Sequence, residues 1–527
     1  MTATPSREKR QRFSAGSNPP AKTKSTKQAG NGKRGGDEPA DETSLQIRFA
    51  AAQDEHQDCI GGLSNDGNVD FTVYRWTQDK DGSRWQLQSD DMMVIQAVGW
   101  LQHHARRKGT TATATDCAAW YSKDLAYRRH YLPRPDKHRS LVALRNGVLE
   151  LHMDGRIEVH EPSPDFGATA CVQADVPAEA LVSGNYILKD LDPSSLFGRY
   201  ILSTLPDPEV RAMAQEALAT VLLSRCFERA VWLYGKGENG KSVMLNLLTA
   251  LFPGAHKAMD INRLAVNQFG VAAVLGQRLI TVPEMPSFIK PEAQGLLKAL
   301  VSQDWVPLER KNRDPEVMKP QAVFVMASNH HPNVREHLHG FWRKVVTLPF
   351  TQRVNREHKI DALDSKIITD PAEFRVFIEW LLAGAVRLQM RGRFLHDEEM
   401  PAAVKALRHE QLLDSDNVSN FIHECEIEKD RDWSGREQIY VQYVQFCTAG
   451  NYKPLSEKAF WDRMKDRLDL EAEDFARMRC KGERRQMVKV RSNVLRSEFI
   501  LPSHGIEGEF TDRDVRDEMI ARFGEEE

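Results

Sequence analysis

The stretch AVWLYGKGENGKSVMLNLL, residues 230–248, decides the class of fold. It begins with an apolar run typical of a buried strand, continues through a glycine-rich turn and ends in a sequence typical of a helix. Residues 235–242 match the pattern G-x-x-x-x-G-K-[ST], in which backbone N–H groups between a strand and a helix surround phosphate oxygens. The flanking strand and helix are the context that this motif requires. The stretch therefore predicts a P-loop.

The polar positions of the loop have predicted roles in binding ATP and Mg²⁺. Lys241 is expected to reach the β- and γ-phosphates, and the Ser242 hydroxyl is expected to ligate magnesium. The remaining predicted nucleotide contacts are Gly235, Gly237, Glu238, Asn239 and Gly240. The same glycines also spell G-x-G-x-x-G, the dinucleotide fingerprint. The Lys-Ser pair favours ATP, because nucleoside triphosphate chemistry requires it and dinucleotide binding does not.

Three later apolar runs, at residues 278–282, 322–328 and 345–350, alternate with helical patterns. This alternation predicts an α/β domain with a largely parallel sheet. Glu284 follows the first run, where an acid could hold the magnesium shell or polarise water. Asn329 follows the second run, where an amide could orient the attacking water. A surface acid and a turn-forming asparagine are the alternatives.

Arg343 precedes the last predicted strand of this domain. An arginine there could act as a finger that donates to the γ-phosphate of ATP in a neighbouring subunit. A salt-bridged surface arginine is the alternative.

Taken in order, these motifs resemble the superfamily 3 helicases, specifically the phage/plasmid and poxvirus-type primase–helicases. The resemblance covers about residues 140–470 and includes NGVL at residues 146–149. It implies an AAA+ ATPase that forms a hexameric ring and moves along single-stranded or forked DNA. The roles that it implies are Walker A for Lys241 and Ser242, Walker B for Glu284, sensor 1 for Asn329 and the finger for Arg343.

The resemblance also implies a hairpin that grips DNA at residues 305–313, with Lys311 and Arg313 as the phosphate contacts. An ordinary solvated hairpin is the alternative. The sequence departs from the family at Pro283-Glu284, where many relatives carry two acids, and at Arg343-Lys344, where many carry two arginines.

Many relatives also carry an N-terminal primase domain, and the ~100 residues before the resemblance are short for one. Two other functions therefore stay open. One is a bifunctional primase–helicase, and the other is an AAA+ replication initiator or loader that does not unwind DNA.

A second DNA-binding region is predicted near the C-terminus. Residues 477–491, RMRCKGERRQMVKVR, alternate apolar and basic residues around a Lys-Gly turn, as in a wing hairpin. A helix that starts after a Ser456 cap precedes them. Together they indicate a winged-helix module, with Arg484 and Arg485 as DNA contacts.

These features divide the 527 residues into six parts. The expected parts are a disordered basic tail (1–44), an α+β pre-helicase domain (45–200), the ATPase domain (201–395), a helical connector (396–434), the winged-helix module (435–500) and an acidic tail (501–527). The basic tail could contact other replication proteins. We find no apolar run of membrane-spanning length and no signal sequence, so the expected location is the cytoplasm, or the host cytoplasm if a phage encodes the protein.

Overall fold

The structure is a computed structural model of the chain, which divides into two units, residues 1–44 and 45–527. It describes residues 43–63, 67–134, 139–267, 269–286, 288–310, 316–330, 333–334, 339–353, 360–449, 454–480 and 483–491. The acidic tail and nearly all of the basic tail predicted from the sequence therefore lie outside the described residues. No helix among the described residues is long and apolar enough to span a membrane.

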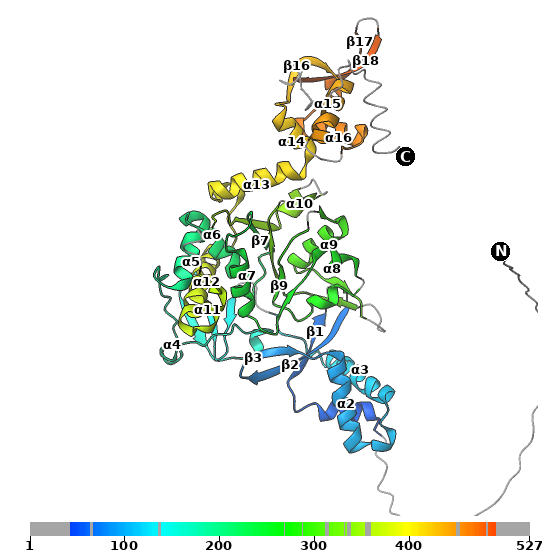
Figure 1. The fold of residues 1–527 in the computed structure, drawn as a ribbon. Coiled ribbons are helices and arrows are strands. Elements are labelled where there is room, and N and C mark those ends of the chain that lie inside the picture. Colours follow the sequence, from blue (N-terminus) through cyan, green and yellow to red (C-terminus); the bar gives the residue numbers. More distant parts are fainter. Residues whose placement is uncertain are drawn as a thin grey trace, which may run out of the picture. The chain divides into compact units, whose positions relative to one another are not determined.

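A parallel five-stranded sheet forms the centre of the larger unit (Figure 1). Its order is β15-β7-β13-β9-β8, and every neighbouring pair is parallel. The strands are β7 (Ala230–Tyr234), β8 (His256–Ala258), β9 (Leu279–Val282), β13 (Val323–Ser328) and β15 (Val345–Pro349). The parallel sheet predicted from the four apolar runs is thus confirmed. The short edge strand β8 was not predicted, because its sequence HKA has no apolar run.

Both faces of this sheet are covered, since alternating residues of β7 enter two different cores. Val231 and Leu233 belong to one core, whereas Trp232 belongs to the other. The first face is covered by α6 (Pro208–Ala219), α7 (Lys241–Ala250) and α12 (Pro371–Arg391), and the second by α8 (Ile261–Val266) and α9 (Pro291–Val301). Burial on both faces explains why β7 is apolar at every position.

A buried arginine fixes α6 to the start of β9. Arg278 is 8% exposed, and its guanidinium donates hydrogen bonds to backbone carbonyl oxygens. The acceptors are Val221 O at 2.8 Å, Gln321 O at 3.0 Å, Thr220 O at 3.0 Å and Leu223 O. Three of these carbonyls follow α6, at the negative end of its dipole. Burial lowers the pKa of Arg278 to about 10.

The N-terminal part of the larger unit contains two antiparallel three-stranded sheets. The first has β1 (Asp58–Leu63), β2 (Val69–Asp79) and β3 (Gly82–Leu87), beside α1 (Leu45–Ala52), α2 (Asp90–His104) and α3 (Thr111–Tyr127). The second has β4 (Ser140–Ala143), β5 (Val148–Leu151) and β6 (Ile157–His160), followed by α4 (Ala178–Ser183) and α5 (Leu196–Thr204). The strands β4 and β5 pair antiparallel on either side of Asn146-Gly147.

The C-terminal part builds a core of its own after α13 (Ala402–Ser415). Its elements are α14 (Asn417–Glu424), β16 (Glu428–Gly435), α15 (Arg436–Ala449), α16 (Glu457–Leu468), β17 (Phe475–Cys480) and β18 (Glu483–Arg491). The strands pair antiparallel in the order β16-β18-β17. Ser456 caps α16 as the sequence predicted, with its hydroxyl accepting from Ala459 N.

One local expectation was wrong in this region. The sequence from residue 428 was expected to continue a helical connector, but it forms β16, which pairs with β18. The strand is polar, EKDRDWSG, and carries no alternating apolar pattern. Its conformation therefore depends on pairing with a distant strand, which the local sequence does not reveal.

Candidate nucleotide-binding site

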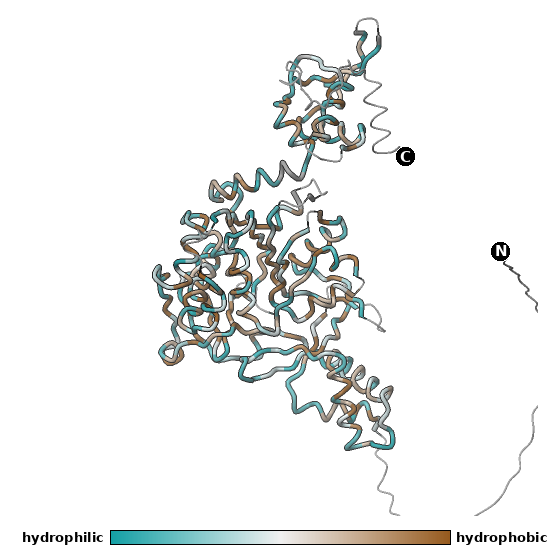
Figure 2. The backbone as a smooth tube through the Cα atoms, viewed as in Figure 1, coloured by the Kyte–Doolittle hydropathy of each residue, from teal (hydrophilic) through white to brown (hydrophobic). Residues whose placement is uncertain are grey.

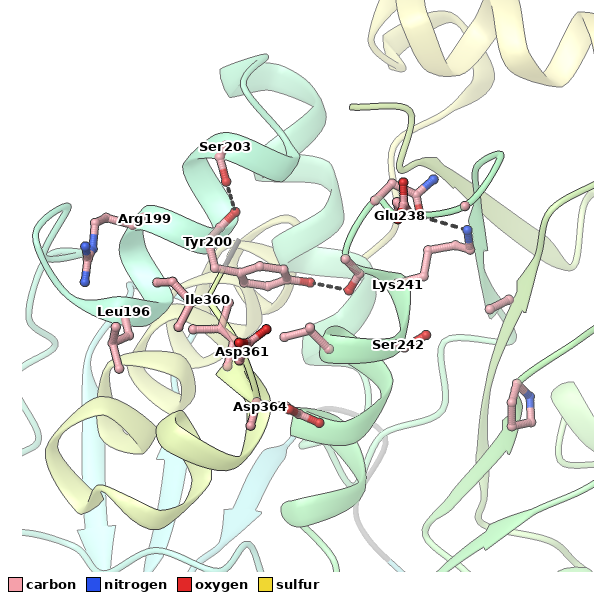
Figure 3. Close-up of a pocket in the computed structure, with 18 of the residues that line it drawn as sticks. Leu196, Arg199, Tyr200, Ser203, Glu238, Lys241, Ser242, Ile360, Asp361 and Asp364 are labelled. Atoms are coloured by element: carbon pink, nitrogen blue, oxygen red, sulfur yellow. Dashed lines mark hydrogen bonds between the residues drawn. The ribbon is translucent and has the colours of Figure 1, made fainter. Parts of the chain in front are cut away.

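A cavity of about 1150 Å³ lies at the carboxyl ends of β7, β9 and β13 (Figure 3). Ligands of open α/β sheets bind at this edge. The glycine-rich loop, residues 237–242, forms one wall together with Glu284 and Asn329. Helix α5 and residues 360–364 form the opposite wall.

Lys241 points into the loop and is held by three oxygen atoms. Its Nζ donates to Gly235 O at 2.5 Å, to Asn239 Oδ1 at 2.8 Å and to Asn329 Oδ1 at 3.0 Å. All three acceptors are neutral, and within the described residues no carboxylate forms an ion pair with this lysine. Lys241 is only 7% exposed, and this burial lowers the pKa of its ammonium group. A buried ammonium without a counter-charge is electrostatically suited to an anion such as phosphate.

Two glycines of the loop are required by close packing. A Cβ atom at Gly235 would lie 1.9 Å from Phe350 O, a backbone atom at the end of β15. Gly240 has a φ of 80°, and a Cβ atom there would lie 2.7 Å from a ring carbon of Tyr200 on α5. The Tyr200 hydroxyl donates to Gly240 O at 2.8 Å. The loop is therefore wedged between α5 and the end of β15, where it precedes the first turn of α7.

The structure brings together the side chains that the sequence predicted around the P-loop. Ser242, Glu284 and Asn329 all line the same cavity as Lys241. Backbone hydrogen bonds hold the strand ends in place. Met285 N, next to Glu284, donates to Ala327 O at 2.8 Å, and Gly235 N donates to Ser328 O at 3.2 Å.

The wall formed by α5 and residues 360–364 was not predicted. It contributes apolar side chains, Leu196 and Ile360, and two carboxylates, Asp361 and Asp364 (Figure 3). Asp364 accepts from Asn246 Nδ2 on α7 at 2.5 Å. These residues are far from the P-loop in sequence and carry no motif, so only the fold could reveal them. The cavity thus has a polar end at the loop and a partly apolar end at α5.

Arg343 lies away from this cavity. It precedes β15, whose register pairs Val345 with Ala230 and Pro349 with Tyr234. Arg343 is therefore at the edge of the sheet where β7 begins, whereas the P-loop is at the edge where β7 ends. The rise of the five residues of β7 separates these edges by about 16 Å. Arg343 is exposed, and it borders a smaller cavity of about 480 Å³ with Lys298 and Asp304.

The predicted DNA contacts lie on other elements. The antiparallel strands β11 (Val306–Leu308) and β12 (Glu316–Met318) form the stem of a hairpin. Lys311 and Arg313 lie outside the described residues. Arg484 and Arg485 are exposed neighbours on β18.

Comparisons with known proteins give three similarities. A model of a family of unknown function, DUF5906, matches residues 233–341, from within β7 to α10 (His339–Trp342). A protein of Acanthamoeba polyphaga mimivirus, named as a candidate helicase, is 24% identical over 278 residues. That match covers 50% of this chain and 26% of the mimivirus protein, so the chain spans about a quarter of that relative.

Among solved structures, the apo C-terminal region of NrS-1 is 12% identical, with a TM-score of 0.36 over 58% of this chain and 77% of that one. A JCV helicase with a bound thiazolopyridine compound is 14% identical, with a TM-score of 0.23 over 40% of this chain and 57% of that one. TM-scores of this size carry no argument about a shared fold or activity.

Proposed function

We propose that this chain is an ATP-dependent DNA helicase of superfamily 3 type that acts in phage or plasmid DNA replication. The observation that carries the proposal is Lys241, a buried ammonium whose hydrogen-bond partners among the described residues are neutral oxygens, in a cavity shared with Ser242, Glu284 and Asn329. This set supports hydrolysis of a nucleoside triphosphate. The similarity to a mimivirus protein named as a candidate helicase supports the use of that hydrolysis to separate strands.

Each side chain of the cavity has a distinct part in the proposed reaction. Lys241 neutralises the β- and γ-phosphates, and Asn329 orients the attacking water. Ser242 and Glu284 would hold Mg²⁺, which would offset the negative charge of the phosphates. Because Asn329 Oδ1 accepts from Lys241 Nζ, a phosphate that binds this lysine competes directly with the amide. Nucleotide binding would therefore change the position of Asn329, which is the behaviour expected of a sensor.

The proposed DNA contacts are the β11–β12 hairpin, through Lys311 and Arg313, and the C-terminal module. We infer a winged helix for that module from its element order, α14-β16-α15-α16-β17-β18, with β17 and β18 as the wing. Contacts to phosphates would make DNA binding tolerant of sequence and sensitive to salt. A ring of identical subunits, with six as the proposed number, would place Arg343 of one subunit at the cavity of the next.

Strand displacement tests this proposal. The full chain with Mg-ATP is expected to displace a labelled strand from a forked duplex, and substrates with only a 5′ or a 3′ tail give the polarity. Lys241→Ala is expected to lose hydrolysis and displacement together. Hydrolysis without displacement on any tailed substrate would support the initiator or loader and overturn the helicase. Labelled-nucleotide incorporation into primers would show the primase–helicase.

A further inference from the structure

The outer face of α3 carries two exposed aromatic side chains. Trp120 is 45% exposed and Tyr127 is 87% exposed. They are seven residues apart, which is two helical turns and about 10 Å. Lys123 lies between them on the same face, because positions at i, i+3 and i+7 share one side of a helix. Single exposed apolar residues are ordinary on a protein surface. Two exposed aromatic rings in line with a lysine are less ordinary and are typical of a surface that binds a partner.

The opposite face of α3 is firmly buried, so this outer face is a fixed platform. Tyr121 is 1% exposed, and its hydroxyl donates to Asp58 Oδ2 at 2.9 Å. Arg75 on β2 donates to both oxygens of the same carboxylate, at 2.8 and 2.7 Å. Phe49 of α1 packs edge-on against Tyr121, with ring centroids 6.2 Å apart. The rotation of α3 about its axis is therefore set, and Trp120 and Tyr127 must face outward.

The charges along this face favour an anionic partner. The turn that leads into α3 carries three consecutive exposed cations, Arg106, Arg107 and Lys108. Arg129 is exposed just beyond the other end of the helix, and no hydrogen bond or ion pair engages Lys123 within the described part of the chain. Asp124 pairs with Arg128 at 2.7 Å, and Arg128 also pairs with Asp54, which follows α1, at 2.8 Å. Among the described residues of α3, Asp116 is the only exposed acid that lies in line with the two rings.

We propose that the outer face of α3 binds single-stranded DNA, with bases stacked on Trp120 and Tyr127 and a phosphate at Lys123. Single strands offer the base faces that a duplex hides, and stacking on aromatic side chains tolerates any sequence. The cations at both ends of α3 extend the path for the backbone. This surface adds to the proposed helicase function but does not depend on ATP hydrolysis.

Nucleotide-free binding of the full chain to a fluorescent oligo-dT tests this surface. Trp120→Ala with Tyr127→Ala is expected to raise the Kd at least about tenfold at fixed salt. Trp120→Phe with Tyr127→Phe is expected to restore most of the affinity, because the rings remain. Lys123→Gln is expected to lower the slope of log K against log salt by about 0.7. Basal ATPase activity is expected to stay unchanged in all of them.

Ile95→Ala is the matched control, because it truncates a side chain that is 59% exposed on α2 of the same region. An equal loss of affinity in that variant would show a general effect and overturn the proposal. Unchanged affinity in the double alanine variant, or no binding of oligo-dT by the wild-type chain, would also overturn it. If the wild-type chain binds oligo-dT through these rings but displaces no strand, the proposed DNA-binding surface is supported and only the proposed helicase activity is contradicted.

Discussion

The glycines of the glycine-rich loop at residues 235–240 look equivalent in sequence, but the atoms around them differ. A Cβ at Gly235 would collide with backbone at 1.9 Å, whereas a Cβ at Gly237 would have no atom within 4 Å. Gly237 still has a φ of 97°, where a side chain costs about 1–3 kcal/mol. Close packing and backbone conformation can therefore be separated at these two positions.

Gly235→Ala is expected to displace the loop or the end of β15, lowering the unfolding temperature by several degrees and abolishing nucleotide binding. Gly237→Ala is expected to fold with a smaller loss, because it has only backbone strain to accommodate. Thermal unfolding and binding of a fluorescent ATP analogue measure both effects. Equal unfolding temperatures for the two variants would contradict this packing of the loop.

His256 makes the stability of the sheet depend on pH. Its Nε2 lies 2.8 Å from Thr281 Oγ1, and burial lowers its pKa below the ordinary 6.5. Below about pH 6.5 the unfolded chain binds a proton that the folded chain does not, so stability falls as the pH drops toward the folded pKa. His256→Gln is expected to reduce this loss between pH 7.5 and 5.5 in urea unfolding. The same loss of stability in the wild type and in the His256→Gln variant would contradict this role of His256.

At the scale of elements, the strand pairing of the C-terminal module separates arginines that are adjacent in sequence. Arg484 pairs directly with Arg479 on β17, whereas Arg485 pairs with Met478. Successive side chains of a strand point to opposite faces, so Arg484 and Arg485 face opposite ways. Like charges directly opposite each other destabilise a sheet by up to about 1 kcal/mol. We therefore expect the Arg479–Arg484 pair to cost stability in the free chain and to bind a DNA phosphate in the proposed complex.

Arg479→Gln with Arg484→Gln is expected to weaken duplex DNA binding about tenfold and to lower the salt slope by nearly two. The same variant should be slightly more stable, because a repulsion is removed. The sequence predicted Arg485 as a DNA contact too, but the register places it on the other face of the wing from Arg484. Arg485→Gln is therefore expected to change affinity much less than the double variant. Fluorescence anisotropy across a salt series gives both readouts. A larger effect of Arg485→Gln would place DNA on the opposite face of the wing.

The sequence predicted elements where the local pattern is strong. The strands β7, β9, β13 and β15 follow from apolar runs buried on both faces, and the loop side chains follow from the motif at residues 235–242. The wall of the cavity formed by α5 and residues 360–364 could not be predicted, because its residues meet only in the folded chain. The polar strand β16 was missed for the same reason. Local patterns thus located the end of the cavity formed by the glycine-rich loop, but they did not predict the residues at its other end.

At the scale of the whole molecule, the position of Arg343 bears on whether the protein acts as an assembly of several copies. About 16 Å of sheet separates the start of β7 from its end. A side chain at the first edge cannot reach a phosphate at the second edge of the same chain. Lys344 is held at the first edge by Glu228, with Nζ and Oε2 at 2.5 Å. If Arg343 takes part in hydrolysis, it must therefore do so in a neighbouring copy of the chain.

Arg343→Ala is expected to bind ATP nearly as well as the wild type but to hydrolyse it about 10³–10⁵ times more slowly, the range known for arginine fingers. The Arg343→Ala chain keeps an intact cavity, and the Lys241→Ala chain keeps an intact arginine. Neither alone should turn over ATP. Mixed assemblies should recover part of the activity, because some interfaces then pair an intact cavity with an intact arginine. Arg343→Ala combined with Lys344→Ala controls for the possibility that Lys344 takes over the role of Arg343.

Co-purification of two tags would show that mixed assemblies form. If they form and activity does not return, then Arg343 does not act across subunits. In that outcome the ring loses its main support, whereas the nucleotide site at Lys241 does not.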